Sequence, residues 1–277
     1  METVKNLKGC GDLHLHSRFS DGSLDVENIM FLAAKVGLGY ISITDHDYFN
    51  DLNYFKKLED EYKIKIIFGA ELSCMDFKRN RKVHILCYNI KTTDLLKPFC
   101  EESLKTRRDS AKKVLNSLSE QYNIIPELIE KYKSKNGCIF ETNILRIFAE
   151  CGYSNKVCGD FYNVVFKGEN KINFIHHDVR KILKLIRESG GKSVLAHPRV
   201  HDSFDLLNEL VLEKLLDGVE VWHPKNNDED RKYLYDIATK NDLIATGGTD
   251  FHGLYNSSVV RIGDFYTPNL YINRILN

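Results

Sequence analysis

The sequence has no long hydrophobic run and no excess of one charge. Its 277 residues include 39 basic and 39 acidic side chains, so the formal net charge is zero and no long-range field attracts nucleic acid or membranes. An uncharged stretch long enough to cross a bilayer is missing, and the first residues lack the apolar core of a signal peptide. We therefore expect a cytoplasmic protein without membrane contact. If it binds a polyanion, it must do so through local charges or through metal ions.

Cysteine is sparse and has no paired spacing. The seven cysteines are an odd number, and none belongs to a Cys-x-x-Cys motif. This argues for reduced thiols rather than a disulfide framework or a zinc ribbon. We expect mainly structural roles for Cys10, Cys74, Cys87, Cys100, Cys138, Cys151 and Cys158.

The segment 12–22 is the most informative stretch that is present. It reads Asp-Leu-His-Leu-His-Ser-Arg-Phe-Ser-Asp-Gly, and its alternation places His14 and His16 on one face of a strand. Two imidazoles at a strand end form a metal chelate, and the following turn can fold Asp21 back as an oxygen donor. Taken alone, a His-x-His pair also fits a half-buried strand with polar tips.

Strands alternate with helices along most of the chain, and hydrophobic content of 43% suffices for one large domain or one domain with an insertion. We expect helices over 25–36, 52–62, 179–188, 204–216 and 228–240. Further strands are expected over 40–44, 64–68, 82–88, 192–196, 218–222 and 243–246. Residues 93–175 form mainly helical, amphipathic runs, which we interpret as an inserted helical subdomain between barrel segments 8–92 and 176–277.

Histidines and carboxylates lie on these strands or just beyond their ends, where active sites gather in parallel α/β barrels. The set is larger than one tetrahedral ion needs and indicates two or three metals bridged by carboxylate. Imidazole and carboxylate without thiolate favour manganese, iron or zinc. Such a centre suits phosphate ester hydrolysis by a metal-activated hydroxide, without a covalent nucleophile. The candidates are His14, His16, Asp21, Asp45, His46, Glu71, His84, His197, His223, Asp250 and His252.

Several motifs, in this order, resemble the polymerase and histidinol phosphatase (PHP) family: Asp-Leu-His-Leu-His-Ser at 12–17, Thr-Asp-His-Asp at 44–47, Gly-Ala-Glu at 69–71, Leu-Ala-His-Pro at 195–198, Gly-Val-Glu-Val at 218–221 and Gly-Thr-Asp-Phe-His-Gly at 248–253. The resemblance implies an α/β fold, a distorted, TIM-like (β/α)₇ barrel, with three divalent ions.

Carried over by position, the resemblance assigns all nine expected ligands. The first ion would take His14, His16, Glu71 and Asp250, and Glu71 would bridge to a second ion held by His84 and His197. A third ion would take Asp21, His46 and His252. Glu71 and Asp250 are therefore predicted to be catalytic as well as ligating. Asp45 and Asp47 are expected to orient imidazoles or to cap the strand end.

The insertion resembles that of the family branch acting on 3′,5′-nucleoside bisphosphates and on the 5′ ends of short RNAs, on the residues Arg107 and Arg108, Thr-Asn-Ile at 142–144, Gly-Tyr at 152–153 and Ser-Gly-Gly at 189–191. This implies a phosphoesterase for small nucleotidic substrates, with Mn²⁺ as the expected metal and Fe²⁺ or Zn²⁺ as alternatives. We infer no obligatory protein partner. A histidinol-phosphate type of phosphatase is the alternative enzyme, and a non-catalytic metal-binding regulatory module is the alternative of another class.

Three further side chains are candidates for contact with substrate. Arg199 follows a ligand motif and could clamp phosphate, or it could be a solvated loop arginine. His223 could donate a proton to the leaving oxygen, or it could pack structurally beside Trp222. Arg107 could line a cap over the substrate, although a charged helix run is usually a solvated face.

Overall fold

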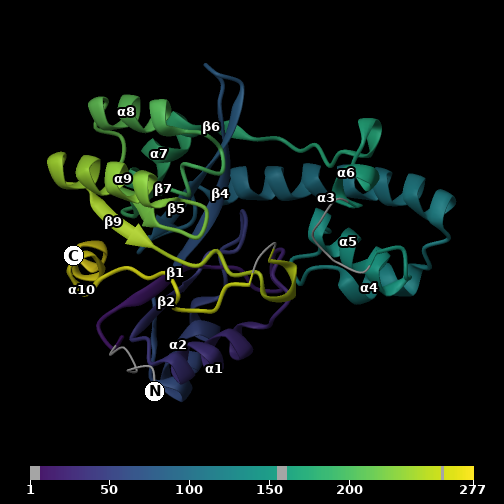
Figure 1. Ribbon diagram of the computed structural model, residues 1–277, viewed down its shortest axis with the longest axis horizontal. Coiled ribbons are helices and arrows are strands. Elements are labelled where there is room, and N and C mark those ends of the chain that lie inside the picture. Colours follow the sequence, from purple (N-terminus) through teal and green to yellow (C-terminus); the bar gives the residue numbers. More distant parts are fainter. Residues whose placement is uncertain (1–6, 155–160, 257–258) are drawn as a thin grey trace.

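The computed structural model describes residues 7–154, 161–256 and 259–277, so the role expected for Cys158 lies outside the described residues. Figure 1 shows helices α1 and α2 on one side of the strands and α7, α8 and α9 on the other. Helix α3 extends sideways from the strands to a group of further helices. Within the described part, no helix combines the length and apolarity that a membrane span requires.

The N-terminal third forms a small parallel sheet covered by two helices. Its strands are β1 (Gly11–Leu15), β2 (Tyr40–Ile43) and β3 (Lys65–Ile66), in that order. Helix α1 (Val26–Val36) buries an apolar stripe and ends at Gly37, whose φ of 79° suits glycine. Helix α2 (Leu52–Tyr62) begins where the Asp51 side chain accepts a hydrogen bond from the Tyr54 amide. The two helices and β2 are confirmed nearly residue for residue, whereas β3 is shorter than the strand expected over 64–68.

The second sheet has the order β6-β4-β5-β7-β8-β9 and is mixed rather than parallel throughout. Its strands are β4 (Gly69–Asp76), β5 (Arg81–Tyr88), β6 (His177–Asp178), β7 (Lys192–Leu195), β8 (Gly218–Trp222) and β9 (Ile244–Gly247). Strand β5 runs antiparallel to both of its neighbours, β4 and β7. The parallel arrangement that alternating strands and helices indicate therefore does not extend to β5. The reason is local, because only a short turn joins β4 to β5, and such a turn reverses the chain.

Single bridges connect the two sheets at two places. His46, just after β2, pairs in parallel with Glu71 in β4, in the same register as the β2–β3 pairs. On the other side, Leu15 of β1 pairs in parallel with Phe251, which follows β9. The amide of His16 also donates to the Phe251 carbonyl at 3.0 Å. The first and last strands of the chain are therefore neighbours.

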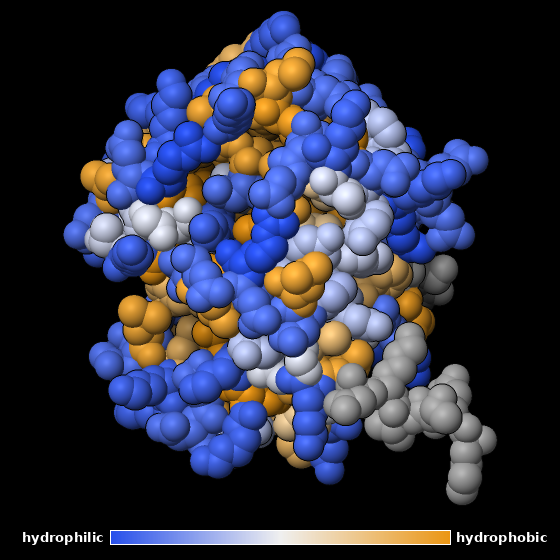
Figure 2. Space-filling model, turned by 90° about the vertical axis from the view of Figure 1, so that its left-hand side faces the viewer, coloured by the Kyte–Doolittle hydropathy of each residue, from blue (hydrophilic) through white to orange (hydrophobic). Residues whose placement is uncertain are grey.

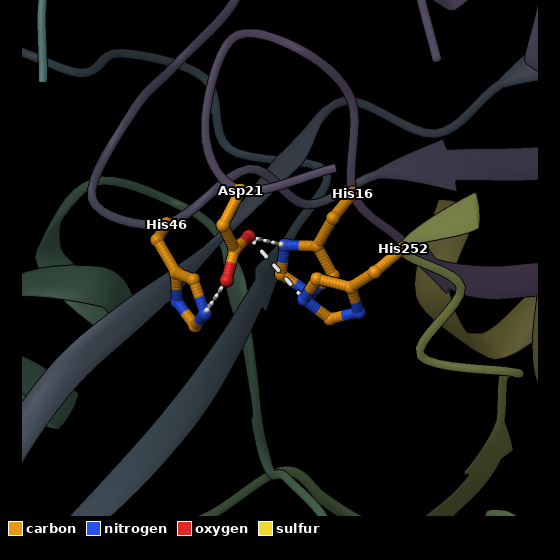
Figure 3. Close-up of side chains that lie close together, drawn as sticks. All are labelled: His16, Asp21, His46 and His252. Carbon is orange, nitrogen blue, oxygen red and sulfur yellow. Dashed lines mark ion pairs between the residues drawn. The ribbon is translucent and has the colours of Figure 1, made fainter. Parts of the chain in front are cut away.

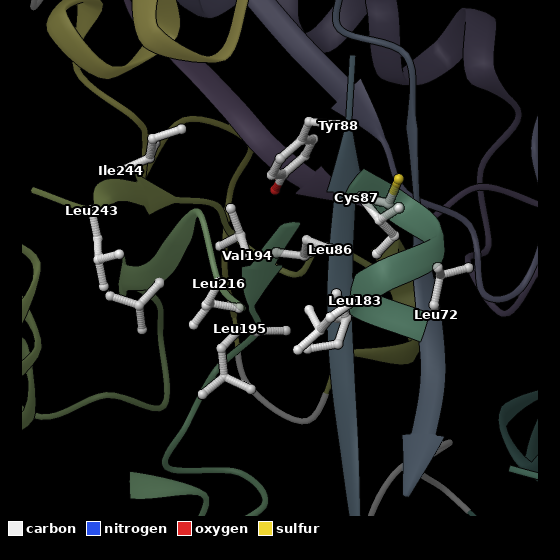
Figure 4. Packing of buried hydrophobic residues seen from close by; sticks show 14 of the residues in the cluster. Leu72, Leu86, Cys87, Tyr88, Leu183, Val194, Leu195, Leu216, Leu243 and Ile244 are labelled. Atoms are coloured by element: carbon white, nitrogen blue, oxygen red, sulfur yellow. The ribbon is translucent and has the colours of Figure 1, made fainter. Parts of the chain in front are cut away.

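The main hydrophobic core lies between the second sheet and helices α7 (Val179–Glu188), α8 (Phe204–Leu212), α9 (Asp228–Lys240) and α10 (Asn269–Leu276). Helix α7 buries Val179, Ile182, Leu183 and Ile186, the spacing of one helical face. Figure 4 shows Leu183 beside Leu86 of β5 and Leu195 of β7. Each such fully buried side chain contributes about 1.5–3 kcal/mol. In Figure 2, the face of the molecule carrying α8 to α10 is mainly hydrophilic, with small separate apolar areas.

The helices between β5 and β6 have a hydrophobic core of their own. They are α3 (Lys97–Tyr122), α4 (Pro126–Tyr132), α5 (Glu141–Glu150), α6 (Phe161–Val165) and the short 3₁₀ helix η1 (Gly168–Asn170). Their buried cluster includes Leu118, Ile144 and Phe148, and all its fully buried members lie between Ala111 and Ile172. The first turn of α3 packs differently, because Cys100 belongs to the main core.

Candidate metal centre

Glu71 lies at the centre of a cluster of imidazoles and is almost fully buried. It is the third residue of β4, so it stands inside a strand and not at the end of the strand predicted over 64–68. Its Oε2 atom lies 3.1 Å from Nε2 of His14, 3.1 Å from Nε2 of His16 and 3.4 Å from Nδ1 of His46. These three histidines lie on β1 or just beyond β1 and β2.

The second oxygen of Glu71 faces two other histidines. Its Oε1 atom lies 2.8 Å from Nδ1 of His84 and 2.8 Å from Nε2 of His197. His84 belongs to β5, and His197 follows β7. One carboxylate therefore faces five imidazoles from four segments of the chain, which is the arrangement expected of a bridging ligand.

Asp250 supplies a second carboxylate to the same centre. Its Oδ1 atom lies 3.4 Å from Nε2 of His14 and 3.2 Å from Nε2 of His16. Its Oδ2 atom lies 3.3 Å from Nε2 of His223, which follows β8. Asp250 adopts a φ of 50° and His197 a φ of 23°, conformations that are uncommon for these residues and concentrate at functional sites.

Asp21 forms the third part of the cluster, shown in Figure 3. Its Oδ1 atom lies 3.4 Å from Nδ1 of His16 and 3.2 Å from Nε2 of His252. Its Oδ2 atom lies 3.6 Å from Nε2 of His46. The turn after β1 thus brings this carboxylate back over the strand end, as the sequence predicts. His16 and His46 face both Asp21 and Glu71 through different nitrogens.

The donor atoms fit divalent metal ions. Nε2 of His14, Nε2 of His16 and Nδ1 of His46 are buried and have no hydrogen-bond partner among the described residues. Buried imidazole nitrogens that face carboxylates without a hydrogen bond are oriented as metal ligands are. Among the described residues, five groups bring donor atoms within 4.8 Å of one another. Three of them contain expected ligands alone: His14, His16, Glu71 and Asp250; His16, Asp21, His46 and His252; and His46, Glu71 and His84.

The electrostatics of the centre also favour bound cations. Burial acts to raise the pKa of Glu71, but the facing imidazoles of His14, His84 and His46 outweigh it and hold that pKa well below its usual value. Conversely, burial acts to lower the pKa of His16, but Asp250 and Glu71 raise it to about 10. The carboxylates therefore stay charged and stabilise positive charge between them, which a metal ion supplies.

Glu220 is a supporting residue to which the sequence analysis gave no role. It is fully buried on β8, accepts a hydrogen bond from Nδ1 of His14 at 2.8 Å and another from the amide of His197 at 2.7 Å. With the proton on Nδ1, His14 keeps a free lone pair on Nε2, the nitrogen that faces Glu71. The available signal was an acidic residue inside the otherwise apolar strand segment 218–222.

Asp45 and Asp47 hold backbone around the centre. Asp45 accepts hydrogen bonds from the amide and hydroxyl of Ser17, at 2.8 and 2.7 Å, and from the Ser20 hydroxyl at 2.6 Å. It thereby fixes the loop that carries Asp21. Asp47 accepts from the Ser73 amide at 2.8 Å. Both carboxylates position the segments bearing ligand candidates, rather than hydrogen-bonding an imidazole directly.

The structure gives the three predicted substrate contacts different surroundings. His223 accepts a hydrogen bond on Nδ1 from the Lys225 amide at 3.1 Å, so its Nε2 carries the proton that faces Asp250. A cavity of about 200 Å³ reaches this pair and is also lined by Thr142 of α5 and Tyr255.

The two arginines are engaged with other side chains. Arg107 is buried, with its guanidinium 3.6 Å from the centroid of the Phe174 ring and 3.9 Å from Oδ2 of Asp47. The guanidinium of Arg199 instead forms a two-pronged ion pair with Asp230 of α9. Arg107 therefore lies close to the centre, beside a residue adjacent to His46, whereas Arg199 is directed toward α9.

His201 is a further imidazole beside the centre. Its ring centroid lies 4.6 Å from that of His84 and 5.3 Å from that of His197. The donor atoms of these three histidines lie within 4.8 Å of one another. Burial lowers the pKa of His201 to about 2, so the imidazole is neutral at ordinary pH.

Comparison with known proteins agrees with this geometry. A family model described as the PHP domain matches residues 12–192. Phosphoribosyl 1,2-cyclic phosphate 1,2-diphosphodiesterase of Eggerthella lenta is 31% identical over 250 residues, which cover 88% of this chain and 94% of the relative. The 5′-3′ exoribonuclease Rnm of Escherichia coli is 28% identical over 253 residues, covering 87% and 84%. A solved structure from Bifidobacterium adolescentis, described as a metal-dependent phosphoesterase, has the same fold, with a TM-score of 0.86 at 24% identity and coverage of 96% and 95%.

Proposed function

The chain belongs to the PHP domain family and is a hydrolase of phosphoester bonds, and from this premise we propose that it acts on small phosphorylated compounds built on ribose. The observation that carries the proposal is Glu71, a buried carboxylate whose two oxygens face five imidazoles from four separate segments. A purely structural metal site seldom needs more than four ligands, and the candidate ligands around Glu71 are more numerous than that. Their number supports a catalytic centre.

The centre would hold three divalent ions, with Mn²⁺ as the expected metal and Fe²⁺ or Zn²⁺ as alternatives. The first would be held by His14, His16, Glu71 and Asp250, the second by Glu71, His84 and His197, and the third by Asp21, His46 and His252. When bound, such ions polarise phosphoryl oxygens and supply hydroxide near neutral pH. The orphaned nitrogens of His14, His16 and His46 support this assignment.

His223 donates a proton to the leaving oxygen. The hydrogen bond from Lys225 to its Nδ1 leaves the proton on Nε2, which points toward Asp250 and the cavity. Asp250 orients that imidazole. Arg107 lies beside the same centre and balances phosphate charge that enters it, while Arg199 has a weaker claim to this role because Asp230 already pairs with it.

We also propose that the strands close into a distorted (β/α)₇ barrel. The bridges from His46 to Glu71 and from Leu15 to Phe251 support a ring of β1, β2, β4, β5, β7, β8 and β9. Residues 93–175 form an inserted helical subdomain over one rim, with barrel segments at 8–92 and 176–277. The separate core around Ile144 and Phe148 supports the insertion, and Thr142 in the cavity beside His223 supports its contact with substrate.

The substrate class follows from what the relatives share. The names of both relatives, a phosphoribosyl cyclic phosphate diesterase and an exoribonuclease, describe substrates with a phosphorylated ribose. We expect the same feature in this chain's substrates, as 3′,5′-nucleoside bisphosphates or the 5′ ends of short RNAs. A ribose 1,2-cyclic phosphate diester is the second candidate, favoured by the 31% identity to the Eggerthella lenta enzyme.

The test is a side-by-side assay of manganese-loaded protein. The substrates are adenosine 3′,5′-bisphosphate, a short 5′-phosphorylated RNA, 5-phosphoribosyl 1,2-cyclic phosphate and histidinol phosphate. We expect kcat/KM for at least one ribose compound to exceed that for histidinol phosphate by at least tenfold. Asp250→Asn is the inactive control. Asp264→Asn makes the same change at a surface carboxylate that pairs with Arg261, and it should keep full activity.

Two results would overturn the proposal. A preference for histidinol phosphate would identify a small-metabolite phosphatase instead. Several tightly bound ions without turnover of any phosphoester would identify a metal-binding regulatory module. Measuring metal content on the same preparation separates these outcomes from a protein that was not loaded.

A further inference from the structure

We propose that His201 is a tenth metal ligand, which completes a group of three imidazoles with His84 and His197 around the second ion. This inference rests on the proposed function, because it concerns an ion of the same centre. The nine ligands assigned from the sequence do not include His201. The sequence alone does not indicate it as a ligand, because it lies four residues beyond His197 in a connecting loop.

Three observations on the side chain support the assignment. The donor atoms of His84, His197 and His201 lie within 4.8 Å of one another, a separation that a single ion can span. Nε2 of His201 and Nδ1 of His197 are both buried without a hydrogen-bond partner in the part of the chain that the structure describes. A buried polar atom without a partner costs free energy unless water or an ion satisfies it.

The loop that carries His201 is held on both sides, so the imidazole is positioned in advance. On one side, Arg199 is fixed to Asp230 through both of its prongs. On the other side, Arg81 donates a hydrogen bond to the Asp202 carbonyl, and Asp202 adopts a φ of 48°. Within the loop, the Val200 amide donates to the His197 carbonyl at 2.9 Å. Arg199 and Arg81 therefore act as positioning residues for the ligand between them.

A tenth ligand changes the donor chemistry of one ion. With His201, the second position offers three imidazole nitrogens within 4.8 Å of one another, and Oε1 of Glu71, which is not part of that group, faces His84 and His197. The third ion has Asp21 with two imidazoles, and the first shares two carboxylates. Nitrogen-rich sites favour Zn²⁺ or Fe²⁺, whereas oxygen-rich sites suit Mn²⁺. The second position is thus the one that selects against manganese.

The experiment compares His201→Gln with wild type and with His177→Gln. The control makes the same change at a histidine of β6 that contacts Phe99 edge to face and pairs with exposed Glu102, outside the metal-ligand groups. Each protein is incubated with equal excesses of Zn²⁺ and Mn²⁺, dialysed, and analysed for both metals per chain. We expect His201→Gln to lose about one equivalent of zinc while keeping its manganese, and the control to match wild type.

A second variant guards against misfolding and tests the ligand role directly. His201→Asp returns a donor atom to the position but replaces nitrogen by oxygen, so it should restore the metal count and shift the second ion toward manganese. Full zinc content in folded His201→Gln would overturn the inference, even if turnover fell, because His201 would then contact substrate instead. A wild-type protein that binds no metal would overturn the proposed function and this inference with it.

Discussion

The substitution Glu220→Gln tests whether a buried carboxylate behind the centre controls metal binding. Glu220 accepts hydrogen bonds from Nδ1 of His14 and from the amide of His197, at 2.8 and 2.7 Å, and it is fully buried. Glutamine has the same shape but only one acceptor oxygen. Its amide group must therefore face one of the two donors, leaving a buried donor unpaired at a cost of about 1–3 kcal/mol.

His14 can avoid this loss only by moving its proton. If Nδ1 accepts a hydrogen bond from the glutamine, the proton shifts to Nε2, the nitrogen that faces Glu71 and Asp250. Either outcome weakens the first metal site. Loss of such outer contacts typically lowers metal affinity or activity about 10- to 100-fold, which is about 1.4–2.8 kcal/mol.

The assay is a metal titration of the metal-free variant, followed by kinetics at saturating metal. We expect a higher Kd for metal and partial recovery of kcat when metal is in large excess. Glu213→Gln makes the same change at a carboxylate that pairs with Arg180 on the surface, and it should bind metal like wild type. A folded Glu220→Gln protein with unchanged metal affinity and unchanged turnover would refute the reasoning.

Four further predictions address other parts of the molecule. Glu71→Ala should abolish phosphate release and lower the metal content measured by elemental analysis; near-normal turnover would reject its bridging role. His223→Gln should reduce kcat about 100-fold or more with metal content unchanged, and equal losses of metal and activity would contradict proton donation. Chelation should lower the free energy of unfolding by about 2.7 kcal/mol for each site that was loaded at 100 times its Kd, seen as a lower Tm that added Mn²⁺ restores. Burial, and then nearby Lys82, lower the pKa of His176 to about 4, below the value of about 6.5 for an unfolded chain. The unfolded state therefore takes up a proton first as pH falls. The free energy of unfolding should be about 1–2 kcal/mol lower at pH 4 than at pH 6.5, and His176→Gln should remove this contribution to the pH dependence.

Local patterns in the sequence were enough to predict most elements and the positions of the ligand candidates. Helices α2, α7 and α9 and strand β8 begin and end at the predicted residues, because each has an apolar period that matches its structure and clear end signals. The structure brings the nine ligand candidates together, although their role as ligands stays a prediction. The motifs that carry the family resemblance surround these residues.

Interactions between distant segments could not be predicted. The direction of β5 depends on a tight turn after β4, which the sequence pattern did not reveal. Of β4, only the first three residues were noted, as the end of the preceding strand. Glu220 was passed over because an acidic residue in a strand has no fixed partner until β8 is placed beside His14. Arg199 pairs with Asp230, a residue 31 positions away, and no local pattern indicates that pairing.

The adjacency of β1 and the segment after β9 gives bound ions a mechanical role. Leu15 and Phe251 form only a single bridge, yet His14 and His16 on one side share carboxylate contacts with Asp250 on the other. Ions bound there would connect two segments that lie near opposite ends of the polypeptide. They would close a loop that contains most of the chain, as a cross-link does. The seam between the first and last strands is then the part of the protein whose opening, and whose amide exchange, is most directly governed by metal supply.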